Sequence, residues 1–251
     1  MVKISKNFTS IAPYYDLLMK RINYREWMFY VESFIKAHRK TTRSILDIAC
    51  GTGNGLMNLR ENYEIYLAFD RSIEMIRVFK KKIDRYASHS PIIFVADARK
   101  IPLLDNSVDV AFSIFDSLNN LLRPKDLKKT FKEVYRILSH GGVFVFDLNT
   151  VHVLKEKWGT KTRIEEDEDM VSIWRTRYHA GVSELHITLF VRKENGRFIR
   201  IDEIHRERGY NRDEVLSMLK DAGFRITEAY EHLTYSPPKK DSFRINYVAV
   251  K

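Results

Sequence analysis

Residues 44–55 read Ser-Ile-Leu-Asp-Ile-Ala-Cys-Gly-Thr-Gly-Asn-Gly, and the rest of the chain is organised around them. The run 45–49 is short and apolar apart from one acid, Asp47, which predicts a buried strand. The alternate glycines of 51–55 predict a tight turn, because glycine takes positive φ and lets a ligand lie close to the main chain. The next residues can start a helix, whose first N–H groups lack partners within the helix. Together these features predict a docking site for a molecule of nucleotide size.

The spacing of the glycines distinguishes two classes of ligand. A dinucleotide-binding turn has the pattern G-x-G-x-x-G, with the pyrophosphate at the helix N-terminus. Here Gly51, Gly53 and Gly55 are spaced G-x-G-x-G, and Asp47 stands four residues before the first of them. A buried carboxylate at that place repels a diphosphate and suits a cationic ligand. A glycine turn without any ligand is the plainest alternative.

Beyond the turn, short apolar runs alternate with segments whose apolar residues recur at helical spacing. The further predicted strands are 64–69, 91–95, 108–114, 143–148, 224–235 and 243–250. Residues 7–40 predict a helical N-terminal cap, and Gly141–Gly142 should end the helix before the fifth strand. This alternation predicts an α/β fold, a doubly wound Rossmann-like sheet of seven mostly parallel strands with helices on both faces.

Between that fifth strand and the next predicted helix, the alternation of strands and helices stops. Residues 170–179, 182–193 and 197–208 alternate polar and apolar side chains, and Asn195-Gly196 is a strong hairpin signal. These features predict a small antiparallel β insertion, preceded by a solvated acidic loop at 165–169. We therefore expect a core made of 1–150 and 209–251, with 151–208 as a substrate lid.

Acidic residues stand in or directly after the predicted strands: Asp47, Asp70, Asp97 and Asp116. The carboxyl ends of parallel strands share one edge of a sheet, where ligands bind. With the segment 46–54, this pattern resembles the class I S-adenosylmethionine-dependent methyltransferases. Within them it is similar to small-molecule methyltransferases that carry Ala-x-x-Tyr-Asp, here 12–16, and Asp-Ser-x-Asn, here 116–119. The resemblance covers nearly the whole chain.

The resemblance implies S-adenosyl-L-methionine as cofactor and a role for each matching residue. Gly51 and Gly53 would hold the methionyl part, with Asp47 near its cationic groups, while Asp70 would accept hydrogen bonds from the ribose hydroxyls. Asp97 would accept from the adenine amino group, and Ala98 would donate from its N–H. The predicted cofactor-binding residues are Tyr15, Trp27, Asp47, Ala49, Gly51, Gly53, Asp70, Arg71, Ile73, Asp97, Ala98 and Phe115.

Methyl transfer from a sulfonium is an in-line displacement, so the protein must mainly position the acceptor and exclude water. A general base is required only where the acceptor has to lose a proton. We expect Asp116 and Asn119 to face the transferring methyl group, and His205 is the candidate base; these three are the predicted catalytic residues. A structural histidine is the alternative reading of His205.

The composition excludes several other functions. One cysteine, Cys50, excludes a disulfide framework and a cysteine metal cluster, and no spacing of ligand residues predicts a metal. No apolar run has membrane-helix length and residues 1–6 lack a signal-peptide core, so we expect a cytoplasmic protein with no membrane partner. The absence of glutamine is typical of many thermophilic proteins.

The net charge of +10 and the pI near 9.5 raise the question of a nucleic-acid partner. The basic residues are scattered, which favours a solvated surface. We therefore expect a methyltransferase that acts on N or O of a small molecule, as a monomer or homodimer. An RNA or protein methyltransferase and a non-catalytic cofactor-binding module stay as alternatives, whereas Asp47 and the glycine spacing disfavour an NAD-type oxidoreductase.

Overall fold

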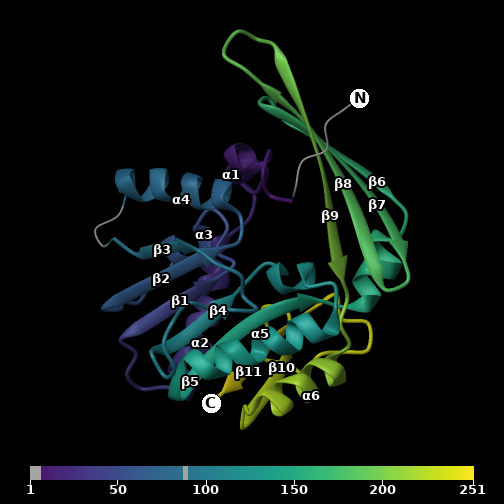
Figure 1. Ribbon diagram of the computed structural model, residues 1–251. Helices are drawn as coiled ribbons and strands as arrows, with labels where there is room; N and C mark the ends of the chain where they lie inside the picture. The colour runs from purple at the N-terminus through teal and green to yellow at the C-terminus, as the bar shows by residue number, and fades with distance from the viewer. Residues whose placement is uncertain (1–6, 87–89) are drawn as a thin grey trace.

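The computed structural model describes residues 7–86 and 90–251, which form two sheets (Figure 1). Within these ranges one sheet has seven strands in the order β10-β11-β5-β4-β1-β2-β3, and the other has four in the order β6-β7-β8-β9. In the larger sheet β11 runs antiparallel to both of its neighbours, and the other pairs are parallel. The predicted fold class, a Rossmann-like sheet with an antiparallel insertion, is confirmed.

The seven-stranded sheet is covered by helices on both faces, as predicted. Its strands are β1 (Ser44–Ile48), β2 (Ile65–Asp70), β3 (Ile92–Val95), β4 (Val108–Ser113), β5 (Leu138–Asn149), β10 (Ile226–Glu231) and β11 (Arg244–Val250). The helical segments are η1 (Ala12–Tyr14), α1 (Tyr15–Leu18), α2 (Tyr24–His38), α3 (Asn54–Met57), α4 (Ile73–Tyr86), η2 (Ser117–Asn120), α5 (Pro124–Ile137), η3 (Val153–Trp158) and α6 (Arg212–Ala222).

The core of the protein forms as two apolar layers because side chains alternate along each strand. Val143 and Val145 of β5 pack in the layer that includes α2 and α4. Phe144 and Phe146, between and after them, pack in the layer that includes α5 and α6. Among the described residues, no helix combines the length and apolar character that crossing a membrane requires.

The expected stop at Gly141–Gly142 is wrong. Helix α5 ends at Ile137, and β5 begins at the next residue and runs through both glycines. The pairing of β4 with β5 shifts register here, from Val108–Leu138 to Val110–Val143. Gly141 has φ +70, so the glycines allow an irregularity inside the strand and do not cap the helix.

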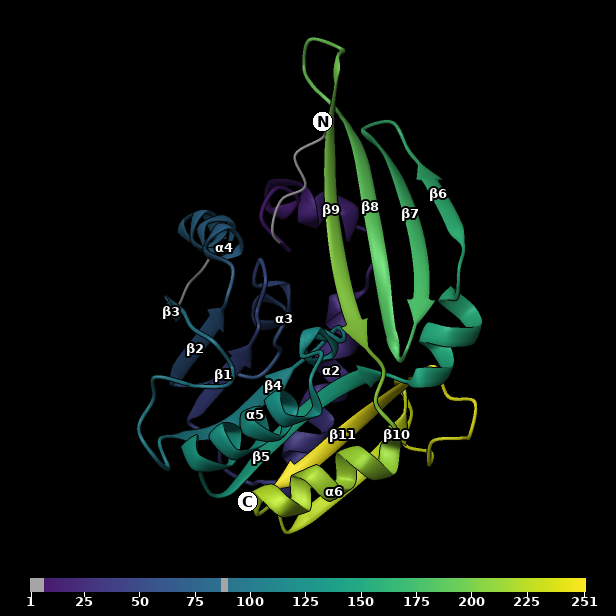
Figure 2. The same cartoon turned by 45° about the vertical axis from the view of Figure 1, so that its right-hand side comes forward.

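The four-stranded sheet stands over the carboxyl ends of the core strands (Figure 2). Its strands are β6 (Thr162–Glu166), β7 (Met170–His179), β8 (Val182–Arg192) and β9 (Phe198–Arg208), all paired antiparallel. The three predicted strands are present. The prediction of a loop at 165–169 is wrong in part, because Glu165 and Glu166 belong to β6, where charged side chains are well suited to an exposed sheet edge.

An N-terminal strap, residues 7–18, passes between the two sheets (Figure 1). Its buried Ile11 packs on Ile187 and Leu189 of the four-stranded sheet. On the core side, the carboxylate of Asp16 accepts from Thr52 Oγ1 at 2.6 Å and lies 2.6 Å from Lys82 Nζ. The strap therefore connects the glycine turn with the four-stranded sheet.

Candidate active site

A cavity of about 1280 Å³ lies between the carboxyl ends of the core strands and the four-stranded sheet. The core contributes Gly51, Asp70 and Phe115 to its wall, and the strap contributes Phe8 and Tyr15. Leu185, Ile187, His205 and Glu207 line it from the four-stranded sheet. The predicted site residues Ala49, Arg71, Ile73, Asp97, Ala98 and Asp116 also line it. Most of the residues predicted from sequence therefore meet in one space.

The glycine turn presents an open backbone to this cavity. Ala49, Gly51 and Gly53 have φ values of 58°, 55° and 81°. A Cβ built on Gly51 meets no atom within 4 Å, so the space above Gly51 is open. A Cβ on Gly53 would lie 2.0 Å from a ring carbon of Phe79, which makes that glycine a packing requirement.

The two glycines should therefore respond differently to alanine. We expect Gly53→Ala to lower the free energy of unfolding by about 2–4 kcal/mol, because overpacking adds to left-handed strain. Gly51→Ala should cost about 1–2 kcal/mol, from the strain alone. The new methyl group of Gly51→Ala projects into the cavity and should weaken cofactor binding at least about tenfold, which is about 1.4 kcal/mol. Urea unfolding and calorimetry measure both quantities; equal stability losses would contradict this assignment.

Besides Asp16, two acids from the core strands lie near the turn, Asp70 and Asp47. The carboxylate of Asp70 accepts from the N–H of Gly51 at 2.9 Å and of Ser72 at 2.7 Å, one on each oxygen. Asp47 is buried, and its Oδ2 has no hydrogen-bond partner among the described residues. Burial raises the pKa of both carboxyl groups, that of Asp47 well above its usual range. Asp70 can still accept further hydrogen bonds, and Asp47 has an unused acceptor.

Asp97 lies in the wall as predicted, but its carboxylate already has a partner. Arg99 donates from Nε at 2.9 Å to one oxygen and from Nη2 at 2.6 Å to the other. These bonds are the main cause that lowers the pKa of Asp97 to about 2. Arg71 approaches the same carboxylate at 4.0 Å with an exposed side chain. Arg99 was not predicted from the sequence, although it stands only two residues after Asp97.

The two predicted aromatic residues of the cap have different positions. Tyr15 lines the cavity, and burial raises the pKa of its hydroxyl well above the usual range. Trp27 is 7% exposed, and its ring centroid lies 4.4 Å from those of both Phe115 and His232. Trp27 was predicted to bind the cofactor, but it is not among the residues that line the cavity. It supports Phe115, which does line the cavity.

Asp116 lies between β4 and η2, in a cluster of charged side chains. Phe115 and Asp116 both have positive φ, 61° and 48°, a conformation that costs non-glycine residues free energy and is frequent at functional sites. Asp116 lies 2.6 Å from Nη2 of Arg244, whose Nη1 lies 2.5 Å from Asp147. Glu207 completes the cluster: its carboxylate accepts from Asn149 Nδ2 at 3.0 Å, and burial together with the charge of Asp116 raises its pKa.

Comparison with known proteins agrees with this arrangement. Residues 45–142 match the family described as a methyltransferase domain. The putative methyltransferase YqeM of Bacillus subtilis is 31% identical over 248 residues, which are 97% of each chain. An S-adenosylmethionine-dependent methyltransferase from Clostridium acetobutylicum has a crystal structure with a TM-score of 0.87, at 27% identity over 96% of this chain and 97% of that one. This chain is a class I S-adenosylmethionine-dependent methyltransferase. Its cofactor is S-adenosylmethionine, as predicted.

A third comparison shows the extent of the shared fold. The sugar N-methyltransferase KedS8 from a Streptoalloteichus species has a TM-score of 0.76 at 18% identity, covering 100% of this chain and 96% of that one. At this identity the likeness concerns the fold alone. Because the match includes every residue of this methyltransferase, the four-stranded sheet is part of the shared fold.

Asn119 has a different place in the methyltransferase from the one predicted. It is fully buried and is not among the residues that line the cavity. Its Nδ2 donates to the carbonyl oxygens of Asn149 at 3.0 Å and Arg208 at 2.7 Å, and its Oδ1 accepts from the N–H of Asn149 at 3.0 Å. These bonds use its amide group, so the expectation that Asn119 faces the methyl group is wrong.

His205 lines the cavity and is 4% exposed. Its Nε2 lies 2.8 Å from a carboxylate oxygen of Glu203, and its ring centroid lies 4.3 Å from that of Phe8. Glu203 also accepts from the backbone N–H groups of the strap, at Phe8 (2.8 Å), Thr9 (3.0 Å), Ser10 (2.5 Å) and Ile11 (3.0 Å). His205 is therefore part of the contact that holds the strap.

Three residues of the charged cluster were missed from the sequence: Asp147, Glu207 and Arg244. A signal for Glu207 was present, because residues two apart on a strand point to the same face. Glu203, His205 and Glu207 therefore form one row on β9, and all three are less than 9% exposed. No local pattern identifies Asp147 or Arg244, which are distant in sequence and pair across β5 and β11.

His232 next to this cluster should make the stability of the methyltransferase depend on pH. Burial lowers its pKa to about 4, and its Nδ1 lies 2.9 Å from Asn246 Oδ1. In the unfolded chain His232 takes up a proton near pH 6.5, whereas in the folded protein it does so only near pH 4. The free energy of unfolding should therefore fall as the pH drops from about 6.5 to 4. Because the ring is partly exposed, we expect about 1–2 kcal/mol from this group.

The variant His232→Asn should flatten this part of the stability–pH curve, as measured by urea unfolding at several pH values. His179→Asn is the matched control, because His179 is exposed at the end of β7. An unchanged acid slope in His232→Asn would contradict the assignment.

Proposed function

We propose that this enzyme methylates a nitrogen or oxygen atom of a small molecule bound between the core and the four-stranded sheet. The observation that carries the proposal is a cavity of about 1280 Å³ that both parts line. Gly51 and Asp70 lie at its core side, and Leu185 and His205 lie on the side of the four-stranded sheet. Small-molecule pockets are commonly about 300–1,000 Å³. The volume therefore supports a cofactor together with a small acceptor.

The residues at the core side fit S-adenosylmethionine. The open space above Gly51 leaves room for a ligand on the backbone. Asp47 is 2% exposed and is not among the residues that line the cavity, so its charge can act on the cofactor only from behind the turn. Asp70 has acceptor capacity left on both oxygens, which suits two ribose hydroxyls. Ala98 lines the wall beside Asp97, and Arg71 and Ile73 line it with largely exposed side chains. We propose the adenine for that place.

Arg99 donates to both carboxylate oxygens of Asp97, so we propose that Asp97 mainly shapes this wall. An adenine amino group that donates to Asp97 would have to use an oxygen that already accepts from Arg99. The N–H of Ala98 is the better candidate for a specific adenine contact. Tyr15 and Phe115 would enclose the end of the cofactor opposite the adenine, and Trp27 stacks on Phe115 from behind.

When bound, S-adenosylmethionine supplies a methyl group on a positively charged sulfur. The residues of the protein have to hold the acceptor in line with that methyl group and keep water away. The four-stranded sheet covers the cavity with Leu185 and Ile187, and the strap covers it with Phe8. We therefore propose that 151–208 form a substrate lid on a core made of 1–150 and 209–251. Under such a lid a small acceptor fits better than an RNA chain.

His205 and Asp116 remain our candidates for acceptor contacts. Both line the cavity, on β9 and after β4 respectively. His205 has one ring nitrogen bonded to Glu203, which leaves the other nitrogen for an acceptor or a proton.

The test is to incubate the enzyme with S-adenosylmethionine labelled in its methyl group and a cell extract, and to separate the products by size. We expect label in the fraction below about 1 kDa, and no such label with a variant that lacks cofactor binding, Asp70→Ala. Label in RNA or protein instead would overturn the small-molecule proposal. Cofactor binding without label in any fraction would favour a binding module.

A further inference from the structure

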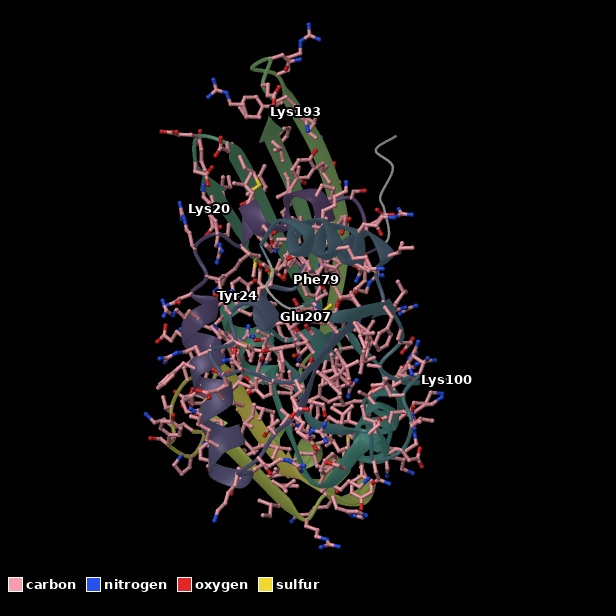
Figure 3. The ribbon with its side chains drawn as sticks, turned by 90° about the vertical axis from the view of Figure 1, so that its left-hand side faces the viewer. Lys20, Tyr24, Phe79, Lys100, Lys193 and Glu207 are labelled. Carbon is pink, nitrogen blue, oxygen red and sulfur yellow. The ribbon has the colours of Figure 1, made fainter. Side chains whose placement is uncertain are left out.

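One end of the cavity is an acidic corner, formed by Asp116, Asp147 and Glu207 around Arg244. Asp116 and Arg244 are 16% exposed at their side chains, and the Asp147 side chain is fully buried. Asp116, Glu207 and Arg244 line the cavity, and Asp147 lies behind them, accepting from the N–H of Asp116 at 2.9 Å. Figure 3 shows Glu207 in the interior, far from Lys193 at the outer end of the four-stranded sheet.

The charges of this corner do not balance. It has three carboxyl groups and one guanidinium, and the nearby His232 adds no charge at neutral pH because burial lowers its pKa to about 4. Oδ1 of Asp147 has no hydrogen-bond partner in the described part of the chain, although the residue is only 1% exposed. A buried carboxylate oxygen without a hydrogen-bond partner is costly, even where the other oxygen of the same group is paired. The corner therefore suits one more positive charge.

Glu207 is the carboxyl group best placed to meet a ligand. It is 8% exposed, lines the cavity and accepts from Asn149 Nδ2 at 3.0 Å. Burial, with a smaller effect of Asp116, raises the pKa of Glu207 well above its usual range. Such a group can hold a proton that an acceptor gives up near neutral pH.

The four-stranded sheet also contributes apolar side chains to the cavity wall. On β8, Leu185 pairs with His205 and Ile187 with Glu203, so they share the inner face of the four-stranded sheet with the row on β9. Trp174, opposite Ile187 on β7, also lines the cavity. An acceptor that fits both the acidic corner and these apolar side chains has an apolar body and a polar, positively charged end.

We propose that the acceptor is an amine, and that the acidic corner binds its ammonium group with Glu207 in direct contact. This inference rests on the proposed function and names its substrate class, a small molecule with a primary or secondary amino group on an apolar body. The ammonium gives one proton to Glu207. Its freed electron pair then forms the bond to the methyl carbon, while the electron pair of the breaking carbon–sulfur bond stays on sulfur. The product is a methylated ammonium ion, and the corner regains its ionised carboxylate when Glu207 releases the proton to water.

The test measures binding to enzyme saturated with S-adenosylhomocysteine, so that no turnover occurs. The probes are phenethylamine, 2-phenylethanol and phenylacetate, which share one apolar body and differ in the end group. We expect the dissociation constant of the amine to be at least about tenfold lower than that of the alcohol, and phenylacetate to bind more weakly still. Equal binding of amine and alcohol, stronger binding of phenylacetate, or binding of none of the three would overturn the inference.

The variant Glu207→Gln should bring the amine within about threefold of the alcohol. Its affinity for S-adenosylhomocysteine should stay within about threefold of the wild type, which also shows that the variant is folded. Glu184→Gln is the matched control, because Glu184 pairs with Arg206 on the outer side of the same sheet, and it should keep the full preference for the amine. If the preference survives in Glu207→Gln, the assignment of Glu207 is wrong.

The result of the amine-binding test can be distinguished from the result of the extract experiment that tests the proposed function. Label that enters small molecules in the extract experiment supports small-molecule methylation even if the amine probe shows no preference. Failure of both experiments would reject the proposed function itself.

Discussion

Asp70→Ala is expected to weaken the binding of S-adenosylmethionine by at least about a hundredfold. In the proposed site its carboxylate accepts two ribose hydrogen bonds, and each bond to a charged acceptor contributes roughly 1.5–3 kcal/mol. Each 1.4 kcal/mol corresponds to about a factor of ten in affinity. The same carboxylate also holds the N–H groups of Gly51 and Ser72, so its loss loosens the turn as well.

Calorimetry with S-adenosylmethionine and with S-adenosylhomocysteine measures this effect. Asp105→Ala is the matched control, because the Asp105 carboxylate is 68% exposed and outside the cavity wall; its affinity should stay within about twofold of the wild type. Circular dichroism should show that Asp70→Ala is folded. An affinity within a few-fold of the wild type would reject the role of Asp70.

Glu203→Ala is expected to lower the free energy of unfolding by at least about 4 kcal/mol. The fully buried carboxylate accepts from the backbone N–H groups of four successive residues, Phe8 to Ile11, and contacts His205. Hydrogen bonds to a charged group contribute about 1.5–3 kcal/mol each, and water can replace part of them once the strap detaches. For a protein of this size the loss corresponds to a fall in Tm of roughly 8–16 °C.

Thermal and urea unfolding measure the effect, and protease cleavage within the strap should become faster. Glu184→Ala removes a glutamate from the neighbouring strand, where it forms a partly exposed pair with Arg206, and should change stability by less than about 1 kcal/mol. Similar values for the two variants would show that the bonds to Glu203 do not stabilise the strap.

The core and its glycine turn could be predicted from the sequence because their signals are local. The turn is contiguous, and the acids at 47, 70 and 97 each follow an apolar run directly, so topology alone brings them to one edge. Strand β6 was missed because an exposed edge strand carries the same charged residues as a loop.

The proposed acceptor side could not be predicted in the same way. Its charged cluster joins a residue just after β4 with residues of β5, β9 and β11 that are widely separated in the chain; Asp147 and Arg244 are 97 residues apart. Asn119 was assigned wrongly for a related reason. Its partners, Asn149 and Arg208, are brought to it only by the tertiary fold.

Those partners of Asn119 mark the two places where the chain leaves the core and returns to it. Asn149 ends β5, and Arg208 ends β9. One residue later, a Cβ on Gly209 would lie 2.7 Å from the backbone of Val151, so the outgoing and returning segments touch. A piece of chain whose ends meet can be exchanged without displacing the elements around it. We therefore expect that, during evolution, the segment between these two points could be replaced as one insertion. The cofactor-binding core would then stay the same while the proposed acceptor pocket changes.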